Sequence, residues 1–401
     1  MNLAIILNQP YPYGYACTNR IHYYAQGVNE AGGKSKIYIP NPTEYDTCTA
    51  KNHHCNGDYK GVSFEYTCGT TTRPENFISR RFAYYKGLIK TAINLYRDRK
   101  EIDAVLIVTN ALKPLLFFKI VTVVLKKKYI QEKSELPFYN KSPKNIIEKT
   151  YQKFYTKYVY KLFDGIIVIS KPLYDYFSGR VKKESRILQV PVIVDASEFL
   201  ETKKRPSCSY IAYCGNFTQA QDGVLNLIEA FKIIAEQYTN LRLCLIGEAN
   251  KKEDKLKVEE LISKLSLSHK IDLEGYVDRD ELVKLLVSAK VLVLAKPKSL
   301  QAEYCFPSKL AEYLITSTPV IVTNVGVIGD YLSDGVDSLL AVPSSVQSIA
   351  EKITKVLSDE KMALEIGAKG RDIALNNFSY QMQVGRIIKF IDELPCKSKI
   401  I

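Results

Sequence analysis

The chain has 401 residues, enough for two domains that each bury a substantial core. Its composition, 46% hydrophobic and 25% charged without a low-complexity tract, excludes a fibrous or intrinsically disordered protein. The whole net charge of +13 lies in residues 1–200, because residues 201–401 contain equal numbers of acidic and basic side chains.

This uneven charge predicts an anionic partner for the N-terminal half. No RNA- or DNA-binding signature accompanies it, so we expect an anionic membrane surface and no nucleic acid. We expect no signal peptide, because the apolar start LAIIL has neither a basic segment before it nor a cleavage site. We also expect no transmembrane helix, because the most apolar run, residues 115–125, is too short and contains Lys119. We therefore expect a cytoplasmic protein, peripheral at the inner face of the membrane.

Nine cysteines are scattered along the chain, several of them inside predicted strands. Their odd number and the chain length fit reduced thiols in a cytosol better than a disulfide framework. One candidate zinc cluster consists of Cys48, His53, His54, Cys55 and Cys68. Its spacing matches no standard zinc finger, so we expect no metal site.

In the first half, apolar runs alternate with helical patterns. Gly14 follows the first strand, where it can adopt positive φ and lets a ligand approach the backbone, and Thr18 or Asn19 would cap the next helix. Residues 40–75 are rich in turns. We expect strands at 3–7, 36–39, 61–67, 104–108, 129–131, 165–170 and 188–194, and helices around 20–28 and at 77–100, 112–125, 145–162 and 171–177.

The helix expected at 145–162 carries a basic stripe, because Lys149, Lys153, Lys157 and Lys161 are spaced four apart with aromatic residues beside them. This pattern is typical of a helix that lies on a membrane surface. A solvated basic face with tyrosines packed inward is the alternative, and the periodicity alone does not decide between them.

The second half repeats strand and helix regularly. We expect strands at 210–214, 241–246, 271–274, 291–295, 319–323 and 338–342, and helices at 222–237, 253–265, 278–288, 307–316, 346–357, 360–376 and 380–394. Such units predict an α/β protein with a mainly parallel sheet in each half, and a cleft between the halves at the carboxyl ends of the strands. The polar run before residue 206 suggests domains at 1–200 and 201–376, followed by a final segment, 377–401.

The segment 290–326 contains a candidate anion site. Pro307 suits the first position of a helix, so the amides of Ser308 and Lys309 would lie unpaired in its first turn. These amides and the helix dipole attract phosphate, and Lys296 and Lys298 lie nearby in the sequence. The alternative is an ordinary crossover with solvated lysines.

Six segments, in this order, resemble one known family: YCGNFTQAQDGVLNLIEAF, LRLCLIGE, LEGYVDRDELVKLL, FPSKLAEYL, PVIVTNVG and GVDSLLAVP. They resemble the C-terminal domain of the GT-B glycosyltransferases of family 4, which are retaining enzymes that use nucleotide sugars. The resemblance covers residues 205–395 well and extends loosely to the N-terminal half through the first glycine loop, residues 135–137 and FDGIIVIS. It implies two Rossmann-like domains facing across a cleft, a last helix that crosses back to the N-terminal domain, and no cofactor or metal.

The resemblance also implies a donor site. Glu312 is similar to the family glutamate that holds the nucleotide ribose, while the partner glutamate eight positions earlier falls on Tyr304, with Glu303 one residue early. Two basic residues that clamp the diphosphate in the family are replaced by Asn216 and Gln221, so a nearby lysine would take over their charge. The expected donor-binding residues are Gly215, Asn216, Gln221, Gly247, Lys296, Lys298, Tyr304, Phe306, Pro307, Ser308 and Glu312, and the expected catalytic residues are Glu303 and Lys309.

Acceptor contacts would come from the N-terminal domain, from Gly14, Tyr15, Arg20, Glu132 and Glu135. For Arg20 the alternative is an ordinary surface charge on a helix. The resemblance therefore predicts a transferase that moves a sugar from a UDP- or GDP-sugar to a lipid-linked or glycan acceptor, in surface polysaccharide or glycolipid synthesis. The alternatives are a degenerate GT-B subunit, a sugar-nucleotide epimerase and, on charge alone, a nucleic-acid binder.

Overall fold

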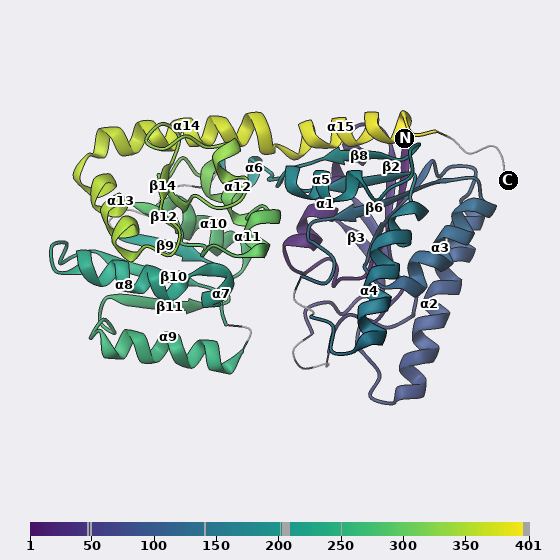
Figure 1. The fold of residues 1–401 in the computed structure, drawn as a ribbon, viewed down its shortest axis with the longest axis horizontal. Coiled ribbons are helices and arrows are strands. Elements are labelled where there is room, and N and C mark those ends of the chain that lie inside the picture. The colour runs from purple at the N-terminus through teal and green to yellow at the C-terminus, as the bar shows by residue number, and fades with distance from the viewer. Residues whose placement is uncertain are drawn as a thin grey trace. The chain divides into compact units, whose positions relative to one another are not determined.

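The computed structural model describes residues 1–45, 48, 50–139, 142–200, 202, 209–249 and 251–395. It divides into two compact units: unit 1 comprises Met1–Pro191 and Tyr380–Ile401, and unit 2 comprises Val192–Ser379. Each unit is an α/β domain built on a mainly parallel sheet, which confirms the predicted fold class (Figure 1).

Unit 1 has a sheet in the order β3-β4-β2-β1-β5-β6-β7-β8. All neighbours are parallel except β3, which is antiparallel to β4. The strands are β1 (Asn2–Leu7), β2 (Lys34–Ile39), β3 (Asn56–Tyr59), β4 (Val62–Tyr66), β5 (Ala104–Val108), β6 (Lys128–Lys133), β7 (Gly165–Val168) and β8 (Arg186–Gln189).

The strand expected at 61–67 is confirmed as β4, but β3, which forms a hairpin with it, is not among the expected strands and lies in the turn-rich residues 40–75. The two-residue turn of this hairpin is Lys60-Gly61, and both residues have positive φ, +48° and +77°. This geometry matches the right-handed twist of the flanking strands, so it closes a tight hairpin.

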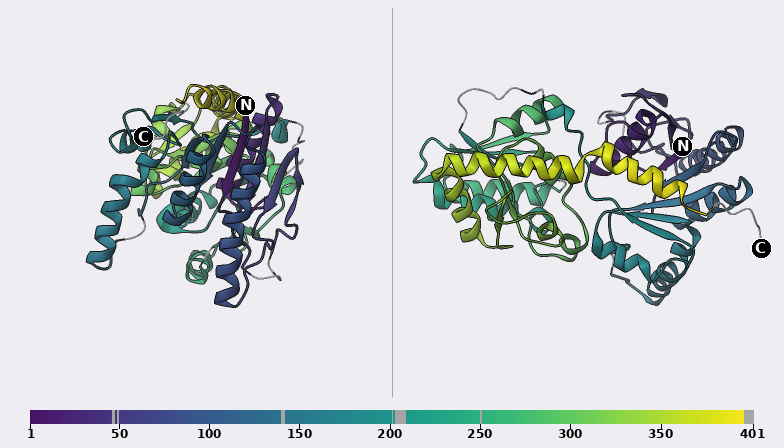
Figure 2. Two further views of the ribbon diagram at one scale, coloured as in Figure 1. Left: turned by 90° about the vertical axis from the view of Figure 1, so that its right-hand side faces the viewer. Right: turned by 90° about the horizontal axis from the view of Figure 1, so that it is seen from above.

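The helices of unit 1 are α1 (Ala16–Glu30), α2 (Phe77–Arg97), α3 (Leu112–Val124), α4 (Ile146–Tyr158) continued by a 3₁₀ turn (Val159–Leu162), α5 (Lys171–Ser178) and α15 (Tyr380–Asp392). From β4 onward the chain crosses the sheet in one direction, so right-handed crossovers put α2, α3, α4 and α5 on the same face (Figures 1 and 2). The chain moves the opposite way from β1 to β2, so α1 covers the other face. There it packs against α15, with the rings of Tyr23 and Tyr380 stacked 5.4 Å apart.

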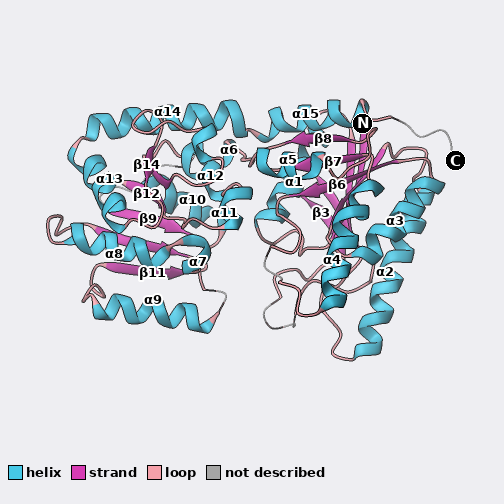
Figure 3. Ribbon diagram, in the orientation of Figure 1, coloured by secondary structure: helices cyan, strands magenta, loops and turns pink. Residues whose placement is uncertain are grey.

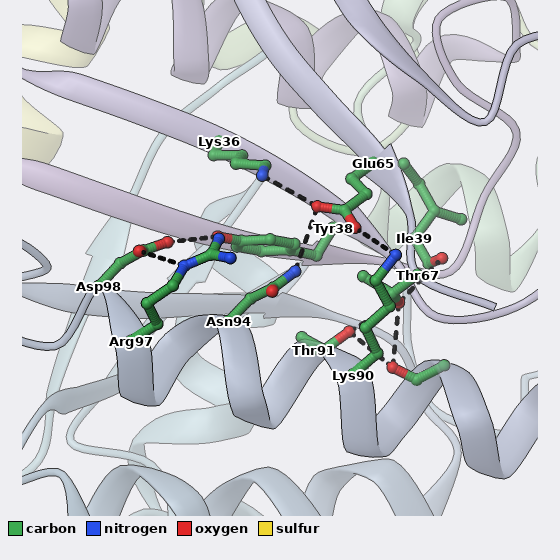
Figure 4. A network of polar contacts seen from close by, with 11 residues as sticks. Lys36, Tyr38, Ile39, Glu65, Thr67, Lys90, Thr91, Asn94, Arg97 and Asp98 are labelled. Atoms are coloured by element: carbon green, nitrogen blue, oxygen red, sulfur yellow. Dashed lines mark hydrogen bonds and ion pairs between the residues drawn. The ribbon is translucent and has the colours of Figure 1, made fainter. Parts of the chain in front are cut away.

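Helix α2 is tied to the sheet by a polar network around Glu65 of β4 (Figure 4). Lys36 of β2, Lys90 of α2 and Asn94 of α2 donate to its carboxylate at 2.9, 2.8 and 3.1 Å. Burial raises the pKa of Glu65, but the hydrogen bonds from Lys90 and Lys36 outweigh it and hold the pKa below its ordinary value. The network fixes which side of α2 faces the sheet.

Unit 2 has a fully parallel sheet in the order β11-β10-β9-β12-β13-β14 (Figure 3). Its strands are β9 (Tyr210–Cys214), β10 (Arg242–Ile246), β11 (Ile271–Gly275), β12 (Val291–Leu294), β13 (Val320–Thr323) and β14 (Leu339–Ala341). Its helices are α6 (Ser197–Leu200), α7 (Gln219–Asp222), α8 (Val224–Ala235), α9 (Lys252–Lys264), α10 (Arg279–Ser288), α11 (Leu300–Tyr304), α12 (Ser308–Ile315), a 3₁₀ turn (Ile328–Asp330), α13 (Val346–Ser358) and α14 (Glu360–Phe378).

Unit 2 begins earlier than residue 201, the boundary expected from the sequence. The segment from Val192 already packs with it, because the Val194 amide donates to the Phe378 carbonyl at 2.8 Å. Within the described ranges no helix is long and apolar enough to cross a bilayer. The same ranges contain no group of three or more His, Cys, Asp or Glu side chains arranged to hold a metal ion.

Candidate functional site

The candidate site lies at the carboxyl edge of the unit 2 sheet. Strand order reverses between β9 and β12, so the loops that follow these strands diverge and leave room for a ligand at that point. Backbone hydrogen bonds join the strand ends there: the Gly215 amide after β9 donates to the Ile246 carbonyl of β10, and the Gly247 amide after β10 donates to the Gly275 carbonyl of β11, each at 2.8 Å.

Two glycines allow the backbones to approach this closely. Gly247 has φ +118°, and a Cβ on it would lie 2.1 Å from the Gly215 carbonyl oxygen. A Cβ on Gly215 would lie 2.2 Å from the Tyr213 hydroxyl and 2.9 Å from Lys309 Nζ. The Lys309 ammonium of α12 therefore lies directly against the loop that follows β9.

We expect Gly247→Ala to destabilise unit 2 by about 2–4 kcal/mol, because the new Cβ is strained at this φ and also collides with backbone. Gly335→Ala is the matched control: Gly335 has φ +75°, but nothing lies within 4 Å of its would-be Cβ. Urea unfolding followed by circular dichroism measures both variants. Equal losses in the two variants would contradict the steric role of the Gly215 contact.

Helix α12 presents its N-terminus at this edge. We expected Pro307 to be the first residue of the helix. It is instead the residue before the helix, which begins at Ser308. In the described part of the chain, the amides of Ser308 and Lys309 have no acceptor, as at any uncapped first turn. The Cys214 amide donates to the Tyr313 hydroxyl at 2.6 Å, which ties α12 to the end of β9.

Glu312 lies one turn further along α12 and is already paired. Arg279, the first residue of α10, donates from one terminal nitrogen to Glu312 Oε1 at 2.7 Å. Its Nε and other terminal nitrogen donate to Glu198 Oε2 of α6 at 2.9 and 2.7 Å. Sequence analysis missed Arg279, although it stands in the family-like segment LEGYVDRDELVKLL, directly after the capping residue Asp278.

The lysines expected to replace the family clamp differ in their surroundings. Lys296 Nζ donates to the Gln221 carbonyl at 2.7 Å and lies 3.4 Å from Asp222 Oδ1, so a carboxylate already neutralises it. Lys298 is exposed. Lys309 is half-buried and forms no ion pair with any residue that the structure describes. The carbonyl of Asn216 accepts from the Tyr213 hydroxyl at 2.8 Å.

Glu303 and Tyr304 lie on α11, a short helix in what we expected to be an irregular loop. Ser299 caps α11 by accepting from the Ala302 amide. Gly326, with φ +57°, packs against it, since a Cβ there would lie 2.1 Å from the Ala302 carbonyl. The Glu303 side chain is exposed and Tyr304 is half-buried.

Phe306, an expected donor contact, is a core residue. Its ring is 4% exposed and packs edge-on against Tyr331 and Phe378, with centroids 5.2 and 5.3 Å away. Any ligand contact from this residue is therefore limited to its backbone. The aromatic packing holds the segment before α12 in place.

The residues expected to bind an acceptor lie in unit 1. Arg20 is buried and not a surface charge: Nε donates to Glu132 Oε1 at 3.0 Å, and a terminal nitrogen donates to the Val190 carbonyl at 2.7 Å. Tyr15 and Glu135 are exposed, and Tyr15, rather than Thr18 or Asn19, is the capping position of α1. Gly14 does not have positive φ; it is needed because a Cβ there would lie 2.2 Å from Thr18 Oγ1.

Comparison with known proteins finds glycosyltransferases that this chain is similar to. Residues 198–373 match the family model described as "Glycosyl transferases group 1". An uncharacterized glycosyltransferase of Methanocaldococcus jannaschii is 27% identical over 242 residues, 60% of this chain and 63% of the relative. A capsular polysaccharide biosynthesis glycosyltransferase of Staphylococcus aureus, CapM, is 25% identical over 185 residues, 43% of each chain. The chain thus matches less than two thirds of the length of these relatives.

Among solved structures, Anabaena HepE in complex with UDP-glucose superimposes with a TM-score of 0.71 at 14% identity, over 98% of this chain and 100% of that one. At this identity the likeness concerns the fold alone. The chain therefore has the two-domain fold of the GT-B glycosyltransferases.

Proposed function

We propose that the protein is a retaining glycosyltransferase of the family 4 type, with its nucleotide-sugar donor bound at the carboxyl edge of unit 2. The observation that carries this proposal is the position of Lys309 Nζ against Gly215, beside the free amides at the start of α12. A cation and two unpaired amides on one short segment suit a diphosphate. The family-model match over residues 198–373 supports the same reading.

Lys309 would supply the charge that Asn216 and Gln221 no longer provide. The bond between the anomeric carbon and the diphosphate oxygen breaks, and the negative charge that develops on the diphosphate is stabilised by the Lys309 ammonium and the Ser308 and Lys309 amides. The acceptor oxygen bonds to the anomeric carbon on the same face, and its proton passes to the departing phosphate. Glu303 would contact the donor sugar from α11, with Tyr304 as the alternative.

Glu312 would hold the ribose. Arg279 fixes its carboxylate through Oε1 and leaves Oε2 available, since the described residues give Oε2 no partner. A carboxylate oriented in this way accepts two sugar hydroxyls without reorganising. Arg279 is in turn fixed by Glu198, so we propose it as a positioning residue for the donor.

We propose a UDP- or GDP-sugar as donor and a lipid-linked or glycan acceptor in surface polysaccharide or glycolipid synthesis, at the cytoplasmic face of a membrane. The names of two compared proteins support this direction: one structure holds UDP-glucose, and one relative serves capsular polysaccharide biosynthesis. Tyr15 and Glu135 are the exposed candidates for acceptor contacts, while Arg20 and Glu132 would shape that region from beneath.

A second reading is a degenerate GT-B subunit or an epimerase that binds a nucleotide sugar without transferring it. It is favoured by one observation, the uncharged Asn216 and Gln221 at the positions of the family's diphosphate clamp. Transfer or hydrolysis of the donor separates this reading from the first.

The test is a thermal-shift panel with UDP-, GDP-, ADP- and CMP-sugars, followed by an assay for donor hydrolysis. A ligand that binds only the native state stabilises it by mass action and therefore raises Tm. The free energy of unfolding increases by about 2.7 kcal/mol when the ligand concentration is a hundred times Kd. We expect a shift with one nucleotide class, its loss in Glu312→Ala and its retention in Glu260→Ala, a change at an exposed glutamate of α9. No shift with any donor would reject the donor site, and a shift without turnover would support the second reading.

A further inference from the structure

Helix α2 has apolar side chains on two opposite faces. Its inner face packs on the sheet through Ala83, Leu88 and Leu95, and the network around Glu65 fixes that orientation (Figure 4). Its outer face carries large apolar side chains at intervals of four, three, four, four and three residues, a continuous stripe along the helix. These side chains are between 48% and 75% exposed: Ile78, Phe82, Tyr85, Ile89, Ile93 and Tyr96.

Helices α3 and α4 extend this apolar surface. They cover the same face of the unit 1 sheet as α2, and α2 contacts α3 (Figure 1). Tyr155 is the one buried residue of α4. The exposed apolar side chains are Leu116, Ile120, Val123 and Val124 on α3, and Ile146, Ile147, Tyr151, Phe154 and Tyr158 on α4. We call the outer sides of these three helices the α2–α4 surface.

The charges on the same helices are almost all positive. Together α2, α3 and α4 contain ten lysines and arginines and a single acidic residue, Glu148. Nine of the basic side chains are exposed, namely Arg80, Arg81, Lys86, Lys90, Arg97, Lys113, Lys149, Lys153 and Lys157. An exposed apolar surface of this extent marks an interaction site, and its charge selects the partner.

We propose that the α2–α4 surface docks on an anionic lipid bilayer, with the apolar stripes in the interface and the basic side chains at the headgroups. The combination of apolar and aromatic stripes with lysine and arginine beside them is what interfacial helices use. Long basic side chains bury their stems and keep their charges among the phosphates. A second copy of the chain fits poorly, because face-to-face pairing would oppose ten positive charges with ten more.

This proposal goes further than the charge of the N-terminal half, since it assigns docking to named apolar side chains on a rigid helix layer. It does not depend on glycosyl transfer, because vesicle binding is measured without donor or acceptor. The two proposals can therefore fail separately.

The first experiment is co-sedimentation of the full chain with vesicles of phosphatidylcholine, with and without phosphatidylglycerol. We expect binding to the anionic vesicles and a loss of roughly tenfold or more in partitioning for the triple variant Phe82→Gln, Ile89→Gln, Ile93→Gln. The control is Ile233→Gln, Leu256→Gln, Leu364→Gln, which removes three large, exposed apolar side chains from α8, α9 and α14. All six positions are at least 44% exposed, so both variants should fold.

A charge arm separates the two contributions. One triple variant of α4 should weaken binding to anionic vesicles: Lys149→Gln, Lys153→Gln, Lys157→Gln. A matched triple variant on the exposed side of α9 should leave binding unchanged: Lys252→Gln, Lys257→Gln, Lys264→Gln. Added salt should weaken the electrostatic contribution of the lysines to vesicle binding and leave the contribution of the apolar side chains unchanged.

A spectroscopic readout tests insertion directly. The chain contains no tryptophan, so a single Ile89→Trp gives an emission signal without background. We expect a blue shift on adding anionic vesicles, and none for Leu256→Trp on α9.

Three results would overturn the proposal. One is absence of binding to any vesicle. Another is vesicle binding that the apolar triple variant leaves intact, since charge alone would then be responsible. The third is a dimer in size-exclusion chromatography that this variant converts to monomer without any vesicle binding, because the occupant would then be a second chain.

Discussion

Lys309→Met is expected to lower the rate of glycosyl transfer by roughly 10²–10³-fold, the effect of removing one preorganised group that stabilises charge in the transition state. The side chain is half-buried, its Nζ lies against Gly215, and no described carboxylate neutralises it. No carboxylate among the described residues therefore competes with a diphosphate for the Lys309 ammonium. Because the charge grows as the glycosidic bond breaks, kcat should fall more than donor affinity.

Two variants sharpen this test. Lys290→Met removes an exposed lysine at the start of β12, the edge of the sheet away from the site, and should leave the rate within about twofold. Lys296→Met removes a lysine that Asp222 already neutralises, so its effect should be much smaller than that of Lys309→Met. A larger effect for Lys296→Met would move the diphosphate toward Asp222 and reject the role given to Lys309.

The fold was predictable because its signals are local. Short apolar runs such as 291–295 and capped helices between them fixed the position of nearly every strand and helix within a few residues. Several elements too short for periodicity were missed, among them the strand β3 and the helix α11. Each of these two is set by turn geometry or a cap, at Lys60-Gly61 and at Ser299.

The candidate site was predictable where one segment contains it. Ser308, Lys309 and Glu312 lie on a single helix, so their grouping follows from the sequence. The pairing of Glu312 with Arg279 joins residues 33 positions apart, and no periodicity connects them. Phe306 was expected to contact the donor because of its place in the sequence, but it is buried in the core. Only the packing of the folded chain distinguishes these two environments.

The same limit applies to α2. Its sequence is apolar on both sides, so the pattern does not identify which side faces the sheet. A partner from another element decides it: Glu65 of β4 accepts from Lys90 and Asn94 of α2 (Figure 4). The Ile89 side is therefore left exposed. The exposure of this stripe thus depends on tertiary structure. The net charge of the N-terminal half, from which we expected a membrane partner, does not reveal it.

Arg20→Met is expected to lower the free energy of unfolding by about 3–5 kcal/mol, because it leaves the Glu132 carboxylate buried without its cation. Both side chains are nearly inaccessible, at 6% and 2% exposure, and the guanidinium also binds the Val190 carbonyl. Ser134 still donates to Glu132, but a hydroxyl does not offset a buried charge. Urea unfolding at neutral pH measures the loss.

The double variant Arg20→Met, Glu132→Gln separates a structural pair from an acceptor-binding arginine. It removes both charges, so we expect it to be more stable than Arg20→Met alone. Arg186→Met, which breaks the half-exposed pair with Glu393, should cost less than about 1 kcal/mol. If Arg20 instead contacts the acceptor directly, its loss would raise the acceptor KM at unchanged stability, and Glu132→Gln would not restore anything. The buried geometry of the pair predicts the first result, in which Arg20 supports the proposed acceptor region from within the fold.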